Sequence, residues 1–367
     1  MKIAILGSRG IPNRYGGFEE FAEKLSIGLI NKGFEVVVYN SSEHDFLDKS
    51  YSGVKIIKKF CPESKIGSAA HFIYDFLSCI DASIRRYDII YNLGYQSAAP
   101  GIFLFRILNS KSIWITNMDG LEWKRKKWSK PVKWLTKKME SLAVKSSSHL
   151  VSDNIGIQEY YKKNYNKDSS FIAYGSNIYS KFKNEYLKYY NIKQDNYYLI
   201  VARLEPENNI SIILDGFVKS NSKFDFIVIG NHNSKYGEYL KLRYSDTKQI
   251  RFIGGVYEKE ELNSIRKYSK LYFHGHTVGG TNPSLLEAMG LGCKIISHKN
   301  QFNKSVLKDF GNYFETSDDI SRLILKDLND SLVFNTLKAI EEVKKNYNWE
   351  KIVNQHIDLF EKLVSSR

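Results

Sequence analysis

Residues 279–290 read GGTNPSLLEAMG and follow the apolar stretch LYFH at 271–274. The apolar stretch predicts a buried strand, and the segment after the glycines predicts a short helix. Thr281 or Asn282 can cap that helix, and Pro283 suits its first turn because no amide there needs a partner. A strand, a glycine-rich turn and a helix in this order are typical of an α/β domain built on a parallel sheet.

The start of this predicted helix suits a phosphate-bearing ligand. The backbone N–H groups of Gly280, Thr281 and Asn282 would lie at the positive end of the helix dipole, which attracts anions. Glu287, one turn further on, can accept hydrogen bonds from the hydroxyls of a ribose. Phosphate donors and a hydroxyl acceptor on one short element favour a nucleotide-sugar site, although an ordinary strand–turn–helix unit would show the same pattern.

The same alternation of short strands and helical patterns covers both halves of the chain. It predicts an α/β fold with two Rossmann-like parallel-sheet domains that face each other across a cleft. The expected parts are an N-terminal domain at 1–175, a linker at 176–196, a second domain at 197–345 and a C-terminal helix at 346–367 that packs back toward the first domain. Strand candidates lie at 2–6, 35–39, 54–57, 88–91, 112–116 and 149–152, and then at 197–202, 224–230, 250–254, 271–274 and 294–297.

The loop after the first predicted strand, GSRGIPNRYGG, carries glycines and cations. Gly16 and Gly17 precede the first predicted helix and let bare amides approach an oxyanion. Arg9 and Arg14 add cationic donors. A dinucleotide site would need G-x-G-x-x-G and an acidic residue after the second strand, where this chain has Asn40. The pattern argues against a dehydrogenase, and glycines that serve only the loop's own conformation remain an alternative.

A cation follows the first strand of the second half. Arg203 comes at the carboxyl end of that strand, where its guanidinium can hold a diphosphate. It could instead pair with Glu205 or Glu207, and such surface ion pairs contribute little to the free energy of folding. Phosphate contact is the favoured interpretation.

Two carboxylates follow the strand at 112–116. Asp119 and Glu122 would lie at the carboxyl edge of the sheet, where they could bind acceptor hydroxyls or act on a proton. Asp119 with Gly120 could equally form only a turn.

Beyond these carboxylates, aromatic and basic residues alternate. Trp123, Trp128 and Trp134 are interleaved with lysines and arginine between 124 and 138. Such a segment can lie on an anionic membrane surface, and it can also bind single-stranded nucleic acid. A solvated basic helix with its tryptophans packed inward would show the same pattern. Because no nucleic-acid module is visible, we rank the membrane surface above RNA.

The length and composition of the chain limit the class of protein to which it can belong. The chain has 367 residues, 43% of them hydrophobic, and a formal charge of +14 from 54 Lys and Arg against 40 Asp and Glu. This excess favours anionic partners. No window approaches the about 18 apolar residues of a membrane span. Met1 leads directly into a predicted strand, so we expect no signal peptide and a cytoplasmic protein.

Candidate metal ligands are few. Cys61, Cys79 and Cys293 are scattered without metal or disulfide spacing. His274 and His276 flank Gly275, but no third ligand follows at a suitable spacing. We therefore expect no metal site, and His276 to contact the donor sugar or its phosphate, with a structural role as the alternative.

Together, GSRGIP with YGGFE at 15–19, DGLEW at 119–123 and the stretch from His274 to Met289 resemble the retaining family-4 glycosyltransferases with the GT-B fold. The likeness is closest to the bacterial branch that includes polysaccharide rhamnosyltransferases. The general family has a glutamate where this chain has Gly279, and a lysine where it has Asn208. These departures argue for a different donor sugar and leave the diphosphate to arginines and loop amides.

The resemblance implies roles for the motif residues. The implied catalytic residues are Asp119, Arg203 and Glu287. The implied donor-binding residues are Gly16, Gly17, Arg203, Asn208, His276, Gly280, Thr281, Asn282 and Glu287. The implied acceptor-binding residues are Arg9, Arg14, Asp119 and Glu122.

The resemblance also implies an activity. It suggests metal-independent transfer of L-rhamnose or a related deoxysugar from a dTDP-sugar, with retention and without a cofactor. The expected acceptor is a polyprenyl-diphosphate-linked saccharide in bacterial surface polysaccharide synthesis at the inner face of the cell membrane. We expect no nucleic-acid partner. A sugar-nucleotide 2-epimerase on a similar doubled fold and a non-catalytic sugar-nucleotide or RNA-binding protein are the alternatives.

Overall fold

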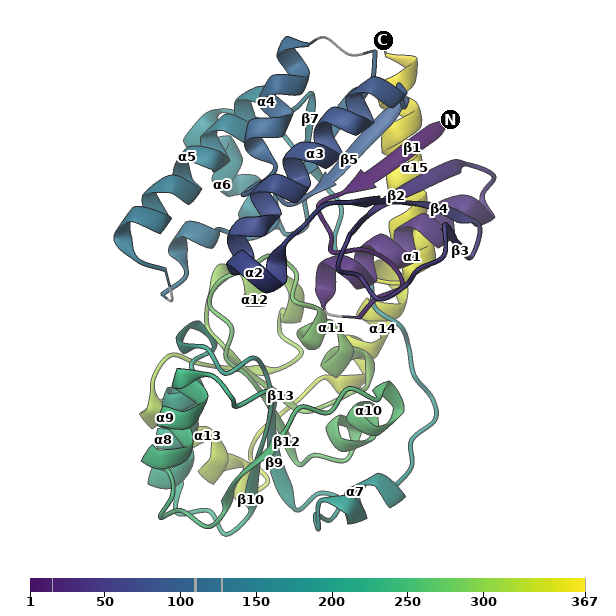
Figure 1. The fold of residues 1–367 in the computed structure, drawn as a ribbon. Coiled ribbons are helices and arrows are strands. Elements are labelled where there is room, and N and C mark those ends of the chain that lie inside the picture. Colours follow the sequence, from purple (N-terminus) through teal and green to yellow (C-terminus); the bar gives the residue numbers. More distant parts are fainter. Residues whose placement is uncertain (15, 109–110, 127, 367) are drawn as a thin grey trace. The chain divides into compact units, whose positions relative to one another are not determined.

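The computed structural model describes residues 1–14, 16–108, 111–126 and 128–366. The chain divides into two compact units (Figure 1). Unit 1 comprises Met1–Lys124, Trp128–Gly175 and Trp349–Arg367, and unit 2 comprises Arg125–Lys127 and Ser176–Asn348. Tyr15 of the first loop and Lys127 of the Trp- and Lys-rich segment lie outside the described residues.

Among the described residues, unit 1 has an eight-stranded sheet in the order β3-β4-β2-β1-β5-β6-β7-β8. β3 runs antiparallel to β4, and the other neighbouring pairs are parallel. Ile3 of the central β1 lies in register with Val36 of β2 and Ile89 of β5. The strands are β1 (Lys2–Leu6), β2 (Glu35–Ser41), β3 (Ser50–Tyr51), β4 (Val54–Lys59), β5 (Ile89–Leu93), β6 (Ile113–Asn117), β7 (His149–Ser152) and β8 (Ser170–Phe171).

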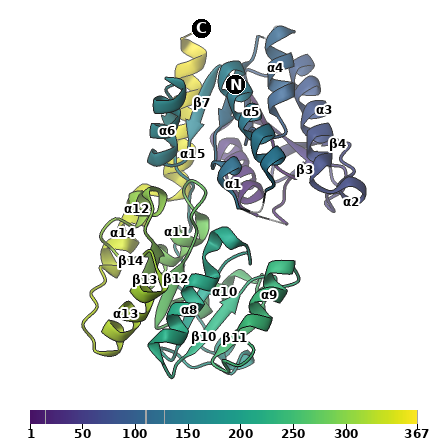
Figure 2. The ribbon, with the colours of Figure 1, turned by 90° about the vertical axis from the view of Figure 1, so that its left-hand side faces the viewer.

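Helices cover both faces of this sheet. They are α1 (Gly17–Asn31), α2 (Glu63–Ile66), η1 (Gly67–Ala69), α3 (Ala70–Arg85), α4 (Ala99–Ile107), η2 (Glu122–Lys124), α5 (Lys130–Ser146), α6 (Ile155–Tyr165) and α15 (Trp349–Ser365). α4 packs between α3 and α5 on one face, and α1 packs against α15 on the other (Figure 2). The rings of Phe21 on α1 and His356 on α15 lie 5.6 Å apart, so the C-terminal helix is part of the unit 1 core.

Unit 2 has, in its described residues, a six-stranded parallel sheet in the order β11-β10-β9-β12-β13-β14. Its strands are β9 (Tyr197–Val201), β10 (Asp225–Ile229), β11 (Ile250–Gly254), β12 (Leu271–His274), β13 (Ile295–His298) and β14 (Asn312–Phe314). Its helices are α7 (Glu185–Tyr189), η3 (Pro206–Asn208), α8 (Ile210–Ser220), α9 (Lys235–Arg243), α10 (Lys259–Lys267), α11 (Pro283–Gly290), α12 (Gln301–Leu307), α13 (Ser317–Leu328) and α14 (Thr336–Asn346).

The two faces of β12 in the unit 2 sheet carry different side chains. Leu271 and Phe273 of β12 belong to a hydrophobic core that includes residues of α8 and α13. Because side chains alternate along a strand, Tyr272 and His274 point to the opposite face. Both are fully buried, so that face holds polar groups beneath its helices. This is the face that carries the candidate site.

The expected α/β fold with two Rossmann-like parallel-sheet domains is confirmed, and the strands at 2–6 and 149–152 have the predicted bounds. Strands buried on both faces read as continuous apolar runs, which makes them easy to recognise. The short β3, β8 and β14 were not predicted, because two or three residues establish no period. Among the described helices, none has the length and apolar character needed to cross a bilayer.

Candidate functional site

The loop between β12 and α11 has the capped geometry that the sequence predicts. Asn282 is the N-cap residue of α11, and its Oδ1 accepts from the backbone N–H of Ser284 at 3.0 Å. Pro283 follows at the first helical position. The amides of Gly279 and Gly280 have no hydrogen-bond partner among the described residues. Two free N–H groups beside a helix start can bind a phosphate oxygen.

A shallow pocket lies over this loop. Gly279 and Gly280, whose amides are free, line it together with Asn282 and Phe302. The lining residues are His276, Thr277, Val278, Gly279, Gly280, Asn282, Phe302 and Asn303. Gly279 has φ +136°, a conformation that L side chains rarely adopt, although space around its Cα is open. The pocket is therefore built by backbone geometry that requires glycine at 279.

Asparagines from α12 hold one side of the loop. Asn300 and Asn303 each donate a side-chain N–H to the carbonyl of His276, at 2.9 Å in both cases. Asn303 also donates to the carbonyl of His298 at 2.9 Å. These residues were missed from the sequence, although two asparagines three apart after a strand are a recognisable helix-start signal.

The other side of the loop is held by η3. The Thr277 hydroxyl donates to the carbonyl of Glu207 at 2.8 Å, and the Asn209 amide donates to the carbonyl of Gly275 at 2.9 Å. A Cβ at Gly275 would lie 2.0 Å from the carbonyl oxygen of Asn208, so only glycine fits there. The loop is thus fixed from two directions before any ligand binds.

Glu287 lies one turn inside α11, as predicted, but it is not an isolated carboxylate. Its Oε2 lies 2.7 Å from Nη1 of Arg266 on α10. Arg266 is buried, whereas 22 % of the Glu287 side chain is exposed. One carboxylate oxygen is therefore engaged by the protein, and the partial exposure leaves the group accessible to a ligand. Arg266 was missed because its partner is 21 positions away on another helix.

Arg203 is exposed at the carboxyl end of β9. Among the described residues, no ion pair engages its guanidinium, and Glu205 and Glu207 instead face Arg125. The distances from Arg125 Nη1 are 3.7 Å to Glu205 Oε2 and 3.5 Å to Glu207 Oε1. The alternative in which Arg203 pairs with these glutamates is not what the structure shows. Arg203 is therefore available for an anion.

Asn208 has a conformational role in the structure. Its side chain is buried and donates to the carbonyl of Arg203 at 2.7 Å. This bond fixes the backbone from which Arg203 projects. The backbone of Asn208 also packs against Gly275 of the site loop.

His274 and His276 stack on each other, with ring centroids 4.4 Å apart and an interplanar angle of 15°. Burial lowers the pKa of His276 to about 3, and nearby Arg203 and Arg125 add to this shift. Burial, with His276 beside it, lowers the pKa of His274 well below its usual value. Both rings are neutral at pH 7 and can accept or donate only as neutral imidazoles.

In unit 1 the first loop is tied to its own elements. The side chain of Asn40 accepts from the N–H of Ile11 at 3.1 Å and donates to its carbonyl at 2.8 Å. Glu19 of α1 accepts from the N–H of Arg9 at 2.9 Å, and Glu23 accepts from the N–H of Asn13 at 2.6 Å. Three loop amides, those of Arg9, Ile11 and Asn13, are therefore already satisfied within the fold.

Gly16 is the N-cap of α1 and Gly17 is its first residue. The Glu19 carboxylate lies 3.5 Å from the position of a Cβ at Gly16. A negative charge at this helix start disfavours a phosphate there. Gly16 and Gly17 are better suited to sugar hydroxyls than to an anion.

Arg9 and Arg14 are engaged in ion pairs. Arg9 binds both carboxylate oxygens of Glu63, with Nε 3.0 Å from Oε2. Arg14 Nε lies 3.1 Å from Asp45 Oδ2 on the surface. Surface pairs of this kind are weak, so Arg14 can exchange its partner more readily than Arg9.

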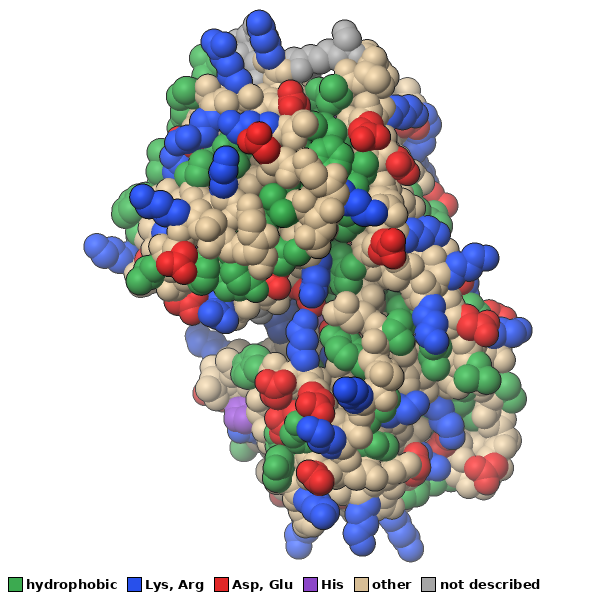
Figure 3. All heavy atoms as spheres, turned by 90° about the vertical axis from the view of Figure 1, so that its right-hand side faces the viewer, with side chains coloured by type: hydrophobic (Ala, Val, Ile, Leu, Met, Phe, Trp, Pro, Cys, Tyr) green, Lys and Arg blue, Asp and Glu red, His purple; other side chains and the backbone are tan. Residues whose placement is uncertain are grey.

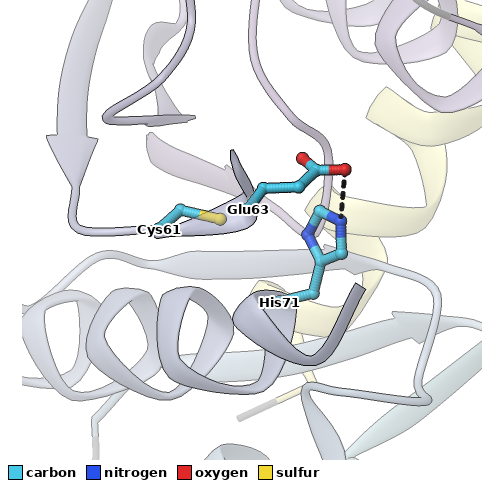
Figure 4. Close-up of side chains that lie close together, drawn as sticks. All are labelled: Cys61, Glu63 and His71. Atoms are coloured by element: carbon cyan, nitrogen blue, oxygen red, sulfur yellow. Dashed lines mark ion pairs between the residues drawn. The ribbon is translucent and has the colours of Figure 1, made fainter. Parts of the chain in front are cut away.

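The Arg9–Glu63 pair belongs to a cluster that could hold a metal ion. The ligand atoms of Cys61, Glu63 and His71 lie within 4.8 Å of one another, and His71 Nε2 is 3.5 Å from Glu63 Oε1 (Figure 4). No metal spacing in the sequence indicated this group, because α2 and α3 bring it together. In the structure the Glu63 carboxylate already has a cation in Arg9, which competes with a metal for the same oxygens.

Asp119 and Glu122 follow β6, as predicted, and both are partly buried. Glu122 accepts from the indole N–H of Trp128 at 3.0 Å. Trp123 donates to the fully buried carboxylate of Glu140 at 3.0 Å. Two of the three tryptophans of the segment are therefore held within the fold.

Two family models match the chain. Residues 182–355 match glycosyl transferases group 1. Residues 1–177 match a domain of unknown function, DUF1972. An uncharacterized glycosyltransferase of Methanocaldococcus jannaschii is 28% identical over 170 residues, which are 43% of this chain and 42% of that relative.

Solved structures share the fold. Sucrose-phosphate synthase from Thermosynechococcus elongatus has a TM-score of 0.80 at 15% identity and covers 100% of both chains. A glycosyltransferase from Rickettsia africae has a TM-score of 0.74 at 12% identity, over 100% of this chain and 99% of that one. Anabaena HepE in complex with UDP and glucose has a TM-score of 0.76 at 14% identity, over 99% and 100%.

These likenesses show the GT-B fold, with two Rossmann-like parallel-sheet domains. The family that matches residues 182–355 and the relative from Methanocaldococcus jannaschii are both described as glycosyltransferases. The loop from Gly275 to Asn282 and Arg203 lie within the matched region, residues 182–355.

Proposed function

We propose that this protein is a glycosyltransferase that moves a sugar from a nucleotide diphosphate to a saccharide acceptor. The observation that carries the proposal is the pocket at the start of α11, where the amides of Gly279 and Gly280 are free and phosphate can bind. Arg203 in the same unit has a guanidinium without an ion-pair partner among the described residues. Both features match the requirements of a diphosphate.

On the donor side, each group has a distinct task. The loop amides and Arg203 bind the diphosphate, and Glu287 accepts hydrogen bonds from the ribose. Asn208 fixes the backbone at Arg203, while Thr281, Asn282 and the neutral His276 line the site around the sugar and its phosphate. Negative charge grows on the diphosphate as the glycosidic bond breaks, so pre-arranged donors there stabilise the transition state.

On the acceptor side, the groups lie in unit 1. Asp119 and Glu122 would bind acceptor hydroxyls, and Gly16 and Gly17 would contact the transferred sugar. Arg9 and Arg14 would reach an acceptor only after exchanging Glu63 or Asp45 as partners. A leaving phosphate oxygen can take the proton of the acceptor hydroxyl on the same face, which gives retention. Arg203 and the amides neutralise the diphosphate in this scheme, so transfer needs no metal.

The donor and acceptor follow from the resemblance of the motifs. We infer that a dTDP-deoxysugar, with L-rhamnose as the first candidate, is the donor. The acceptor is a polyprenyl-diphosphate-linked saccharide of a bacterial surface polysaccharide, at the inner face of the cell membrane. Structures of Anabaena HepE with UDP and with UDP-glucose are a precedent for nucleotide sugars on this fold.

A single incubation tests the activity. The protein is mixed with a panel of nucleotide sugars, with and without a membrane lipid extract, and released nucleotide is measured. We expect release from one donor that depends on the extract. Conversion of a nucleotide sugar without any acceptor would indicate an epimerase instead. Saturable binding of nucleotide sugar without turnover under any condition would contradict a transferase.

A further inference from the structure

The solvent-facing side of α3 is apolar. Its five large apolar side chains are at least 36 % exposed and recur at the spacing of one helix face: Phe72, Ile73, Phe76, Leu77 and Ile84. The buried face of the same helix combines Asp75 and Ser78 with the core residues Ala70, Tyr74, Cys79 and Ala82. A helix packed on a sheet normally has polar residues on its outer face, so the unusual feature of α3 is its exposed apolar face. Exposed apolar surface of this extent marks an interaction site.

The neighbouring helices extend this surface. A Cβ at Gly101 of α4 would lie 2.7 Å from Cys79 Cβ, so α4 lies tightly against α3. Phe103 of α4 is exposed. α5 follows on the other side of α4 and exposes Val132, Trp134 and Leu135 (Figure 2). These three helices form one surface, which we call the α3–α5 face.

The exposed charge in the part of unit 1 that carries the α3–α5 face is mainly positive, and the partly buried Asp81 of α3 pairs with Arg85. Among the described residues of unit 1 between 64 and 146, Asp88 is the one exposed carboxylate, and it already accepts from the N–H of Lys2. The exposed cations in the same range are Lys65, Arg85, Arg86, Lys111, Lys124, Lys130, Lys138 and Lys145. On the side of the molecule drawn in Figure 3, cations are interspersed with carboxylates. An apolar centre with a cationic surround is complementary to anionic lipid.

We propose that the α3–α5 face binds an anionic lipid bilayer, with the apolar side chains of α3 among the acyl chains and the lysines on headgroup phosphates. This deepens the proposed function and rests on it, because it brings unit 1 to the surface that carries a lipid-linked acceptor. A second copy of the chain is a poorer occupant, since it would place the same positive charges against each other.

The proposal also assigns the tryptophans of the basic segment. Trp123 and Trp128 donate their indole N–H groups to Glu140 and Glu122, so they belong to the fold. Among the described tryptophans Trp134 alone is exposed, at 64 %. Trp134 is therefore the residue expected at the headgroup level.

Vesicle partition tests the proposal. The full chain is sedimented with vesicles of phosphatidylethanolamine and phosphatidylglycerol, and with vesicles of phosphatidylcholine alone. The test variant replaces Phe72, Phe76 and Leu77 by Gln, and the matched control replaces Leu242, Val333 and Leu337, three exposed apolar residues of unit 2, by Gln. We expect the test variant to lower the partition coefficient by about tenfold or more, and the control to leave it unchanged. Quenching of tryptophan fluorescence by brominated lipid should disappear in Trp134→Phe.

Several outcomes would overturn the proposal. Equal partition of the wild type and the test variant would do so, as would wild-type binding that is equally strong to phosphatidylcholine. A wild-type dimer that the test variant converts to a monomer would assign the face to a second copy. Melting temperature and nucleotide affinity, measured on each variant, separate these results from misfolding. If the wild type binds the vesicles but binds no nucleotide, the result would count against the proposed transferase and not against the lipid face.

Discussion

Arg266 and Glu287 form an ion pair in unit 2, with Nη1 of the arginine 2.7 Å from Oε2 of the glutamate. Arg266 is 3 % exposed and Glu287 is 22 % exposed in their side chains. The pair therefore has a buried end and an accessible end. Such a pair holds the carboxylate in one orientation at the start of the candidate nucleotide site.

Replacing Glu287 by Gln should affect both stability and nucleotide affinity. The change leaves the Arg266 charge buried without its counter-charge, which costs about 3 kcal/mol in the free energy of unfolding. It also removes a charged acceptor for the ribose, so calorimetric affinity for the nucleoside diphosphate should fall about tenfold. The double change Arg266→Met with Glu287→Met should recover stability but not affinity. Recovery of both would assign the pair a purely structural role.

Arg203→Ala should separate binding from stability. Because Arg203 is exposed and no ion pair engages it among the described residues, the free energy of unfolding should change by less than about 0.5 kcal/mol. Loss of its charged hydrogen bonds should weaken nucleoside diphosphate binding by about 10- to 100-fold and depress turnover. Arg125→Ala is the contrasting variant, since it leaves Glu207 buried and should destabilise the fold. Unchanged affinity in Arg203→Ala would remove this residue from the site.

The fold and the helix start could be predicted because their signals are local. The cap at Asn282, the first-turn Pro283 and the strand at 271–274 each depend on a few consecutive residues. Continuous apolar runs fix which segments are buried strands, whatever their neighbours are. These features needed no knowledge of the packing.

The ion-pair partners could not be predicted in the same way. Glu205 and Glu207 face Arg125, about 80 positions earlier in the sequence, rather than the adjacent Arg203. Arg9 similarly binds Glu63. Which charged side chains form ion pairs depends on how the loops pack around the sheet. The periodicity of the sequence gives no information on that packing. The sequence therefore could not show that Arg9 has Glu63 as a partner, or that Arg125 rather than Arg203 pairs with the two glutamates.

Gly279 can be tested directly, because its φ of +136° lies where an L side chain is strained. Gly279→Ala should lower the free energy of unfolding by about 1–2 kcal/mol and weaken nucleotide affinity by distorting the free amides. Gly279→Glu, which restores the residue of the general family, should be equally destabilised and gain no activity. Chemical denaturation and calorimetry measure the two effects. Higher turnover in Gly279→Glu would contradict the view that this loop is built for glycine.

Acid should destabilise unit 2 through His274. Burial holds the pKa of this residue well below its usual value of 6.5, so the folded state cannot take up a proton that the unfolded state binds. The stability it contributes is present above pH 6.5 and is lost as pH falls below that value. The free energy of unfolding should decline by up to about 1.4 kcal/mol per pH unit for this residue. Urea denaturation between pH 7 and 5 should give a shallower slope for His274→Gln, and an identical slope would contradict the assignment.

Asp75, on the buried face of α3, should give the opposite dependence. Burial raises the pKa of Asp75 to about 7, and a hydrogen bond from Ser97 lowers it only partly. Since the folded pKa exceeds the unfolded value, the protonated carboxyl is favoured by folding, and stability is lost as pH rises from about 4 through 7. Asp75→Asn keeps the shape and an acceptor for Ser97. It should be more stable than the wild type at pH 8 by up to about 4 kcal/mol, and nearly equal to it near pH 4.

Asp81 on the same helix is the matched control for that experiment. Burial raises its pKa, but hydrogen bonds from Arg85 and Lys59 outweigh burial and lower the pKa overall. Asp81→Asn should therefore be less stable than the wild type at pH 8, with the difference disappearing as pH falls below about 4. If Asp75→Asn were also less stable than the wild type at pH 8, the Asp75 carboxylate of the wild type would have to be stabilised by a partner that outweighs the cost of burial. The opposite signs of the two variants distinguish desolvation from ion pairing within one helix.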